Sequence, residues 1–293
     1  MKKFILTCLL AGTSAVMYGQ KDEQGYEDGK WVLKGVAGLN LSQTAMSNWS
    51  SGGENSVAGN AYLNGSLVHK RGHWLWVTNL AMDYGLAKNK SEGVRKNTDK
   101  IELATQLGYT TDNIWFYTLA GNLNTQLAKG YNYPDKEHYI SNFFAPAYSN
   151  IALGVEYRPK SNYSVMLSPA SMKMTFVQDD YLSSIGAFGV DPGKRFRIEP
   201  GAYLKARAEL GIMENVNLIT SADFFTPYNS DFGNVDVNWD VLISLKVNKY
   251  LSATINTTLK YDDDVPTFSE DGTRRGPKVQ FKEVLGVGVA YNF

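Results

Sequence analysis

The stretch AYLKARAELGIMENVNLITSADFF, residues 202–225, decides the fold class. In its first part, apolar residues alternate with Lys205, Arg207 and Glu209. After a break at residues 213–215 the alternation resumes. Alternation with a period of two predicts β-strands with one apolar and one polar face. The stretch therefore predicts two antiparallel strands joined by a tight turn.

The same alternation recurs between Trp31 and Phe293 and predicts about twelve strands. Each apolar row spans roughly nine to twelve residues, about what a tilted strand needs to cross a bilayer, whereas strands of soluble sandwiches average nearer five or six. The parity flips after Pro169, which predicts a β-bulge. At Asn64-Gly65 the parity continues, so we expect a strand there and not a hairpin turn.

The predicted connections are alternately short and long. Short turns fall near residues 70–73, 110–113, 159–162, 213–215 and 248–249, and long polar segments at 43–56, 88–97, 129–149, 178–199, 227–235 and 262–277. Outer-membrane barrels have short periplasmic turns and long outer loops. We therefore expect both termini in the periplasm, and we expect segments 129–149 and 178–199 to form plugs or contact surfaces.

Aromatic residues gather at the ends of the predicted strands. Trp31, Trp74 and Trp115 lie beside the short turns, and Trp239 and Phe281 lie near the opposite ends. Aromatic rings prefer the two interfaces of a membrane. Together with strand length and loop alternation, this pattern predicts an all-β fold: a single antiparallel transmembrane β-barrel in a bacterial outer membrane.

The composition excludes several classes of protein. The 293 residues include 29 Lys and Arg against 29 Asp and Glu, so we expect no nucleic-acid partner. The chain is 43% hydrophobic and 20% charged, which argues against a disordered chain. The 27 glycines and the aromatic content of 13% together suit an all-β protein.

The N-terminus predicts export. A basic start, an apolar stretch and a run of small residues make residues 1–20 a predicted signal peptide. Residues 21–29 are then a short periplasmic arm, and residues 30–293 form the barrel. The sole cysteine, Cys8, lies within the signal peptide, so the mature barrel is expected to hold no disulfide.

Charged residues on the polar faces are the candidate functional residues. Basic residues facing lipid at the midplane would cost about 2–4 kcal/mol each, so the charged rows are expected to face the lumen. The residues selected as lining it are Glu102, Lys205, Arg207, Glu209 and Asp240. Two uses stay open: opposite charges pair and close the lumen, or they line a narrow aqueous path. Because both signs are mixed, we expect weak ion selectivity at most.

Several stretches resemble a Bacteroidota family of outer-membrane barrels that is catalogued only as a domain of unknown function. These stretches are Ser47–Gly53, Asp99–Glu102, Ile140–Ala147, Leu167-Ser168-Pro169 with Met172-Lys173, and Gly186–Val190. The terminal Tyr291-Asn292-Phe293 is similar to the aromatic signal read by the barrel-assembly machinery. The resemblance implies a fold and a location, and it implies no activity and no functional residue.

We expect a passive or weakly selective pore for small polar solutes, and the alternative is a non-conducting partner subunit of an outer-membrane complex. The expected partners are the lipid bilayer, lipopolysaccharide and, through Phe293, the assembly machinery. We expect no enzyme and no cofactor. A hydrolase would need a base such as His138 beside Ser141. Calcium could be bound only by acidic runs such as Asp179-Asp180 and residues 262–264, which lack the spacing of a known loop motif, so no metal is expected.

Overall fold

The computed structural model describes residues 28–44, 56–89, 93–132, 135–160, 162–229, 232–248, 251–262 and 276–292. The predicted signal peptide, most of the predicted arm and Phe293 lie outside the described residues. The same holds for Ser47–Gly53 and for residues 263 and 264 of the acidic run.

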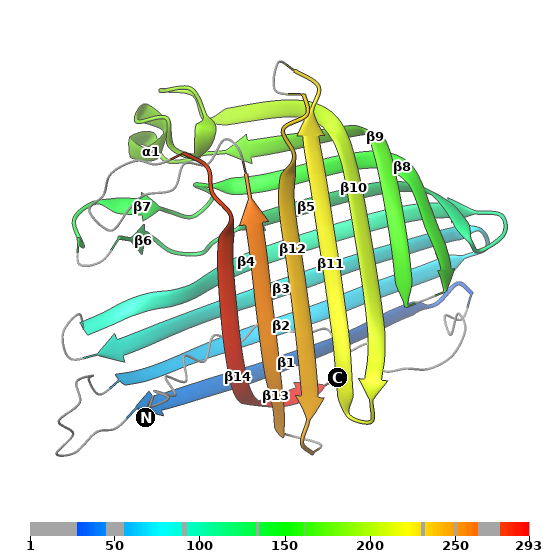
Figure 1. Ribbon diagram of the computed structural model, residues 1–293, viewed down its shortest axis with the longest axis horizontal. Coiled ribbons are helices and arrows are strands. Elements are labelled where there is room, and N and C mark those ends of the chain that lie inside the picture. Colours follow the sequence, from blue (N-terminus) through cyan, green and yellow to red (C-terminus); the bar gives the residue numbers. More distant parts are fainter. Residues whose placement is uncertain are drawn as a thin grey trace, which may run out of the picture.

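Twelve strands form one closed antiparallel barrel, in which β1 pairs with β14 to complete the ring (Figure 1). The barrel strands are β1 (Trp31–Thr44), β2 (Ser56–Arg71), β3 (Trp74–Asn89), β4 (Gly93–Thr110), β5 (Trp115–Thr125), β8 (Ala147–Lys160), β9 (Tyr163–Phe176), β10 (Phe196–Met213), β11 (Val216–Pro227), β12 (Asp236–Lys246), β13 (Leu251–Tyr261) and β14 (Gln280–Asn292). They are 11 to 18 residues long, which is enough to cross a bilayer. The predicted all-β transmembrane barrel of about twelve strands is confirmed.

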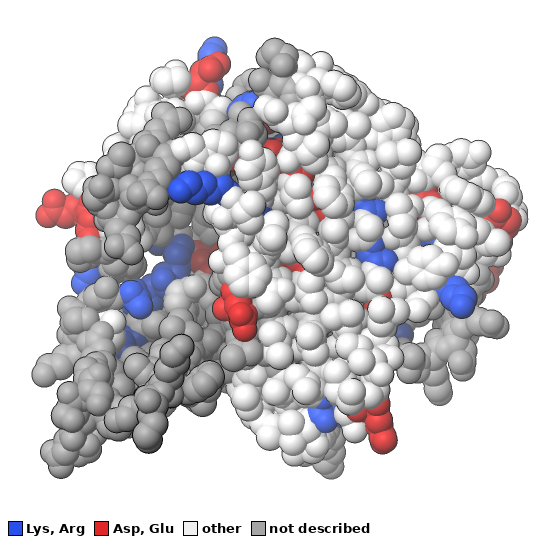
Figure 2. All heavy atoms as spheres, viewed as in Figure 1, with Lys and Arg blue, Asp and Glu red and all other residues white. Residues whose placement is uncertain are grey.

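The outer wall of the barrel is apolar. Leu39, Leu153 and Val287 are each more than half exposed, because the alternation turns them away from the interior. In the view of Figure 2, the wall formed by β10 to β14 consists mostly of residues other than Lys, Arg, Asp and Glu. A closed ring with such a wall suits contact with lipid.

Aromatic rings lie on this wall at the end with the short turns. The rings of Trp74 and Tyr109 are 5.0 Å apart, and those of Trp115 and Tyr157 are 4.7 Å apart. Trp31, at the start of β1, belongs to the same group and is half exposed. These rings form the expected aromatic belt at one interface.

Most of the predicted connections are confirmed, but one is wrong. Segment 88–97 was expected to be a long loop, whereas β3 ends at Asn89 and β4 begins at Gly93. Lys88 pairs with Val94 and Ala87 with Arg95, so the ladder continues through these polar positions. Backbone pairing does not require apolar side chains. The polar side chains of segment 88–97 therefore led to wrong predicted ends for β3 and β4.

Two local expectations about strands are confirmed. Around Pro169 the outward row changes parity, since Leu167 and Met172 are both exposed. The register between β9 and β8 shifts at the same place, opposite Gly154. A Cβ atom on Gly154 would lie 2.2 Å from the Leu167 carbonyl oxygen, so the bulge requires glycine there. Strand β2 continues through Asn64-Gly65 without a turn.

The seam between β1 and β14 is the shortest ladder of the barrel. Among the described residues, only positions 36–39 of β1 are paired with β14, whereas the other neighbouring strands pair at ten or more positions. In Figure 1 the two strands meet near the short-turn end and diverge toward the opposite end. In the described part of the chain, strands β1 and β14 therefore close the ring only in the half of the barrel that is nearer the short turns.

Small elements lie at the end with the long segments (Figure 1): β6 (Gly130–Tyr131), β7 (Tyr139–Ser141), the helix α1 (Asp180–Ser184) and the 3-10 turn η1 (Ala187–Gly189). No helix among the described residues is long and apolar enough to cross a membrane. We use the name "loop cap" for segments 126–146 and 177–195, which contain these elements.

Candidate functional site: the lumen and the loop cap

Strand β10 carries the predicted row of alternating charges on its inner face. Lys205 Nζ lies 3.3 Å from Asp223 Oδ1 of β11, and Arg207 Nη2 lies 3.8 Å from Glu209 Oε2. The side chains of Lys205 and Arg207 are 40% and 38% exposed. Each cation therefore has a nearby carboxylate and is still accessible to water.

The other two predicted residues also lie opposite outward apolar rows. Glu102 Oε1 of β4 lies 2.7 Å from Lys100 Nζ, and these two side chains are 38% and 47% exposed. Asp240 of β12 accepts hydrogen bonds from Thr258 Oγ1 at 2.6 Å and from Asn238 Nδ2 at 3.1 Å. The five predicted residues thus share the inner face, and within the described part of the chain their polar contacts join near neighbours and do not cross the barrel.

A further inner carboxylate, Glu156 of β8, is almost fully buried. Its oxygens accept hydrogen bonds from Arg158 Nη2 at 2.7 Å, from Thr118 Oγ1 at 3.4 Å and from Gln106 Nε2. Charge-assisted bonds of this kind compensate the cost of burying a carboxylate. Glu156 therefore joins β4, β5 and β8 on the inside and has a structural function.

A cluster that was not predicted from the sequence, which we call the rim tie, lies in the lumen at the end with the long segments. Lys173 Nζ of β9 lies 2.6 Å from Asp236 Oδ2 at the start of β12 and 3.1 Å from Asp262 Oδ2 just after β13. The ammonium group also lies 5.8 Å from the centre of the Phe225 ring of β11. Lys173 thus reaches over β10 and β11, and the tie spans part of the interior.

Beside the rim tie, apolar side chains fill part of the interior. Ala152, Met166, Tyr203 and Phe225 form a buried cluster, with Ala120 packed against it. These residues come from β5, β8, β9, β10 and β11. The barrel interior is therefore packed on this side, whereas the exposed charges of Lys100 and Lys205 show space for water elsewhere.

The two segments of the loop cap share a small core. Ala145, Val177, Leu182 and Val190 are buried together, with Tyr139 packed against them. Segments 129–149 and 178–199 were expected to be plugs or contact surfaces. In the structure these two segments pack against each other through this core.

Asp179 is the polar centre of the loop cap. It caps α1 by accepting the backbone N–H of Leu182 at 3.0 Å, and it also accepts hydrogen bonds from Tyr139 Oη at 3.1 Å and Asn142 Nδ2 at 2.9 Å. Although partial burial acts to raise it, the pKa of Asp179 is lowered because these donors stabilise the carboxylate. The carboxylate of Asp180 pairs instead with the Arg195 guanidinium.

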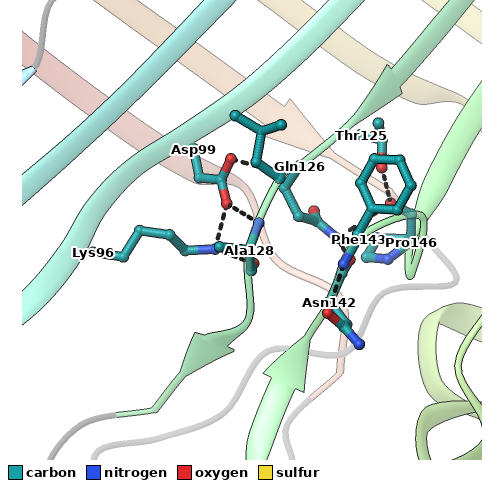
Figure 3. Close-up of polar contacts among 9 residues, drawn as sticks. Lys96, Asp99, Thr125, Gln126, Ala128, Asn142, Phe143 and Pro146 are labelled. Carbon is teal, nitrogen blue, oxygen red and sulfur yellow. Dashed lines mark hydrogen bonds and ion pairs between the residues drawn. The ribbon is translucent and has the colours of Figure 1, made fainter. Parts of the chain in front are cut away.

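A second carboxylate attaches the loop cap to the barrel wall (Figure 3). Asp99 of β4 accepts the backbone N–H groups of Leu127 and Ala128 at 2.7 and 2.8 Å, and it forms an ion pair with Lys96 at 2.7 Å. The Lys96 ammonium also donates to the Ala128 carbonyl at 2.6 Å. Asp99 therefore fixes the direction in which the chain leaves β5.

The enzyme and calcium hypotheses receive no support from these contacts. His138 Nδ1 lies 3.0 Å from Asp135 Oδ2, and the described contacts include no hydrogen bond between His138 and Ser141. The pKa of Asp135 is lowered by backbone N–H groups of the same turn, which is the role of a turn residue. Asp179 is already used as a helix cap, and the described residues contain no cluster of three or more His, Cys, Asp or Glu suited to a metal.

Comparison with known families gives one match. Residues 41–131 match a family described as "Protein of unknown function (DUF3078)", which is less than half of the chain. Two of the five quoted stretches, Ser47–Gly53 and Asp99–Glu102, lie within this match. No curated protein matches the chain.

Among solved structures, the chain is similar to an outer-membrane channel from Pseudomonas putida F1, at 11% identity and a TM-score of 0.42, over 94% of this chain and 100% of that one. It is similar to the NanC porin at 6% identity and a TM-score of 0.40, over 88% and 98%. The translocator domain of the autotransporter NalP from Neisseria meningitidis gives 9% identity and a TM-score of 0.39, over 92% and 90%. At these identities the likeness concerns the fold alone.

Proposed function

We propose that this chain is an outer-membrane barrel through which small polar solutes pass with weak selectivity. The observation that carries the proposal is the exposure of charged side chains on the inner face. Lys100, Glu102, Lys205 and Arg207 are 38% to 47% exposed, although they point away from the lipid-facing wall. Charged groups are stable at such exposure where water surrounds them, so this exposure supports an aqueous path through the interior.

The proposed weak selectivity follows from the pairing of charges. Lys205 lies beside Asp223, and Arg207 lies beside Glu209, so positive and negative fields largely cancel along the path. At the end with the long segments, Figure 2 shows a hollow in which side chains of Lys or Arg and of Asp or Glu are both visible. This hollow is the proposed outer entrance.

The proposed orientation places both termini in the periplasm. Strand β1 begins, and β14 ends, at the end with the short turns, and the long segments lie at the other end (Figure 1). Long loops of outer-membrane barrels face outward. In this orientation lipopolysaccharide surrounds the loop cap, and Phe293 is proposed as the contact for the assembly machinery. We propose no enzymatic activity and no cofactor.

Conductance tests the proposal. The processed protein, inserted into planar bilayers, is expected to give discrete conductance steps that a detergent blank does not give. Arg207→Ala removes the positive charge beside Glu209. It is expected to shift the reversal potential toward the equilibrium potential of the permeant cation. Steps with an unchanged reversal potential would contradict the assigned lining of the path.

A second candidate function is a non-conducting subunit of an outer-membrane complex. The rim tie at Lys173 and the packed cluster around Tyr203 and Phe225 favour it, because both occupy the interior. A correctly folded protein that gives no conductance steps would support this second function and exclude the first.

A further inference from the structure

The loop cap presents a tight turn with apolar side chains at its tip. The backbone N–H of Asn142 donates to the Ala145 carbonyl at 2.8 Å, and the Ala145 N–H donates to the Asn142 carbonyl at 3.0 Å. Phe144 has a φ of +54°, in the left-handed region that bulky residues rarely adopt. Glycine or asparagine would fit this backbone with less strain, so the turn retains a phenyl ring at a conformational cost.

The rings of this turn continue the lipid-facing wall of the barrel. The Phe144 ring lies 6.0 Å from the ring of Phe176, and the Phe143 ring lies 5.9 Å from that of Phe144. Phe176 ends the outward row of β9 that contains Met172, and it is paired with the exposed Phe196 of β10. The apolar surface therefore extends past the strand ends on this side.

Hydrogen bonds hold this turn in place with two of its apolar side chains exposed. The Phe144 carbonyl accepts the backbone N–H of Gln178 at 3.0 Å, and Asn142 is held by Asp179 at 2.9 Å. Phe143 and Ile140 are left 53% and 55% exposed. An apolar patch that is fixed and exposed indicates a surface for contact with another apolar phase.

We propose that the turn formed by residues 140–144 is an anchor that inserts into the outer leaflet of the same bilayer. The patch is continuous with the lipid-facing row of β9, and residues 139–147 contain no charged residue, whereas residues 135–138 on the other side of β7 are all ionisable. Phenyl and aliphatic side chains at the boundary between headgroups and acyl chains fit this position. The proposal rests on the membrane location in the proposed function and does not depend on conduction.

Spin labels test the proposal directly. The sole cysteine, Cys8, lies in the predicted signal peptide, so Phe143→Cys and Ile140→Cys each place a single label in the processed protein. The labelled protein is inserted into phosphatidylcholine nanodiscs, and the accessibility of each label to oxygen and to a water-soluble nickel chelate is measured. Leu204→Cys on the outer wall and Glu137→Cys in the loop cap serve as the lipid and water controls.

The labels at 143 and 140 are expected to give an oxygen-to-nickel ratio near that of position 204 and well above that of position 137. A ratio at both positions as low as that of position 137 would overturn the anchor and leave the patch as a surface for a protein partner. If position 204 is itself open to nickel, the membrane location fails, and the two failures are thereby distinguished. Heat-modifiable migration of each variant shows that the barrel is folded.

Discussion

The side chain of Lys173 lies between two carboxylates at the long-segment end of the lumen. Its ammonium group is shared by Asp236 and Asp262, so Lys173→Met removes the cation and keeps the length of the side chain. The expected results are a larger conductance and a reversal potential closer to the equilibrium potential of the permeant cation. The free energy of unfolding is expected to fall by about 1–3 kcal/mol. Bilayer recordings and denaturant titration measure these quantities.

Lys205→Met is the matched control, because Lys205 pairs with Asp223 of the adjacent strand and does not reach across the interior. We expect it to change the reversal potential without a comparable rise in conductance. Equal effects of the two variants on conductance would show that the rim tie does not restrict the path.

The direction of Lys173 could be predicted from the sequence, but its partners could not. The parity flip after Pro169 places Lys173 on the inner face together with Ser171 and Thr175, which are buried. Its partners lie 63 and 89 residues further along the chain, on β12 and after β13. Contact with them depends on how strongly the wall curves across β10 and β11, and strand patterns carry no information about curvature.

The helix α1 and the turn that contains Asn142 are both held by the carboxylate of Asp179. Asp179→Ala removes the helix cap of α1 and the acceptor for Tyr139 and Asn142, so the cap segment is expected to lose about 0.5–2 kcal/mol of local stability. The adjacent Asp180 is a matched control, because its exposed pair with Arg195 contributes little. Faster hydrogen exchange in residues 177–190 of the first variant, and not of Asp180→Ala, is the expected result.

Acid provides an independent check of the same element. The folded pKa of Asp179 lies below its ordinary value of 3.8, so its contribution is fully present above that value and is lost as the pH falls through the folded pKa. Exchange in residues 177–190 is therefore expected to accelerate only below pH 3.8, relative to β8 and β9. Acceleration already at neutral pH would contradict the assigned role of the carboxylate.

The sequence predicts barrel strands well and loop elements poorly. Alternation identifies each strand because every position must face either lipid or the interior, as at Leu204 and Lys205. The loop cap has no such two-sided environment, and its core joins Ala145 to Leu182 across separate segments. Segment 88–97 was wrongly expected to be a loop for a related reason, since beyond the apolar wall a paired strand and a loop have the same polar composition.

The closure of the whole molecule depends on its shortest ladder. A closed barrel removes the free edges that would otherwise stay unpaired in lipid. Strand β1 is paired with β2 along its full length, from Trp31 to Thr44, but with β14 only at positions 36–39 among the described residues. The first and last strands are the most distant in the chain, and neither a turn nor a loop sets their register.

Cysteine pairs test where this seam is closed. Leu39 and Val289 are paired, and the same register would bring Leu41 opposite Val287, on the same face and in the same class of antiparallel pair. Under oxidation, Leu39→Cys with Val289→Cys is expected to form a disulfide, because paired positions lie within bonding reach. Leu41→Cys with Val287→Cys is expected to react much more slowly, because the described ladder between β1 and β14 ends at Leu39 and Val289.

Leu33 and Leu67, paired between β1 and β2, provide a positive control when both are replaced by cysteine. Gel migration of the denatured chain measures each reaction, since a closed loop migrates faster. Equal rates for the pairs at 39 with 289 and at 41 with 287 would mean that the ladder continues along the seam. In that case the barrel wall would be sealed over the full height of β14, and the lumen would be the sole route through the molecule.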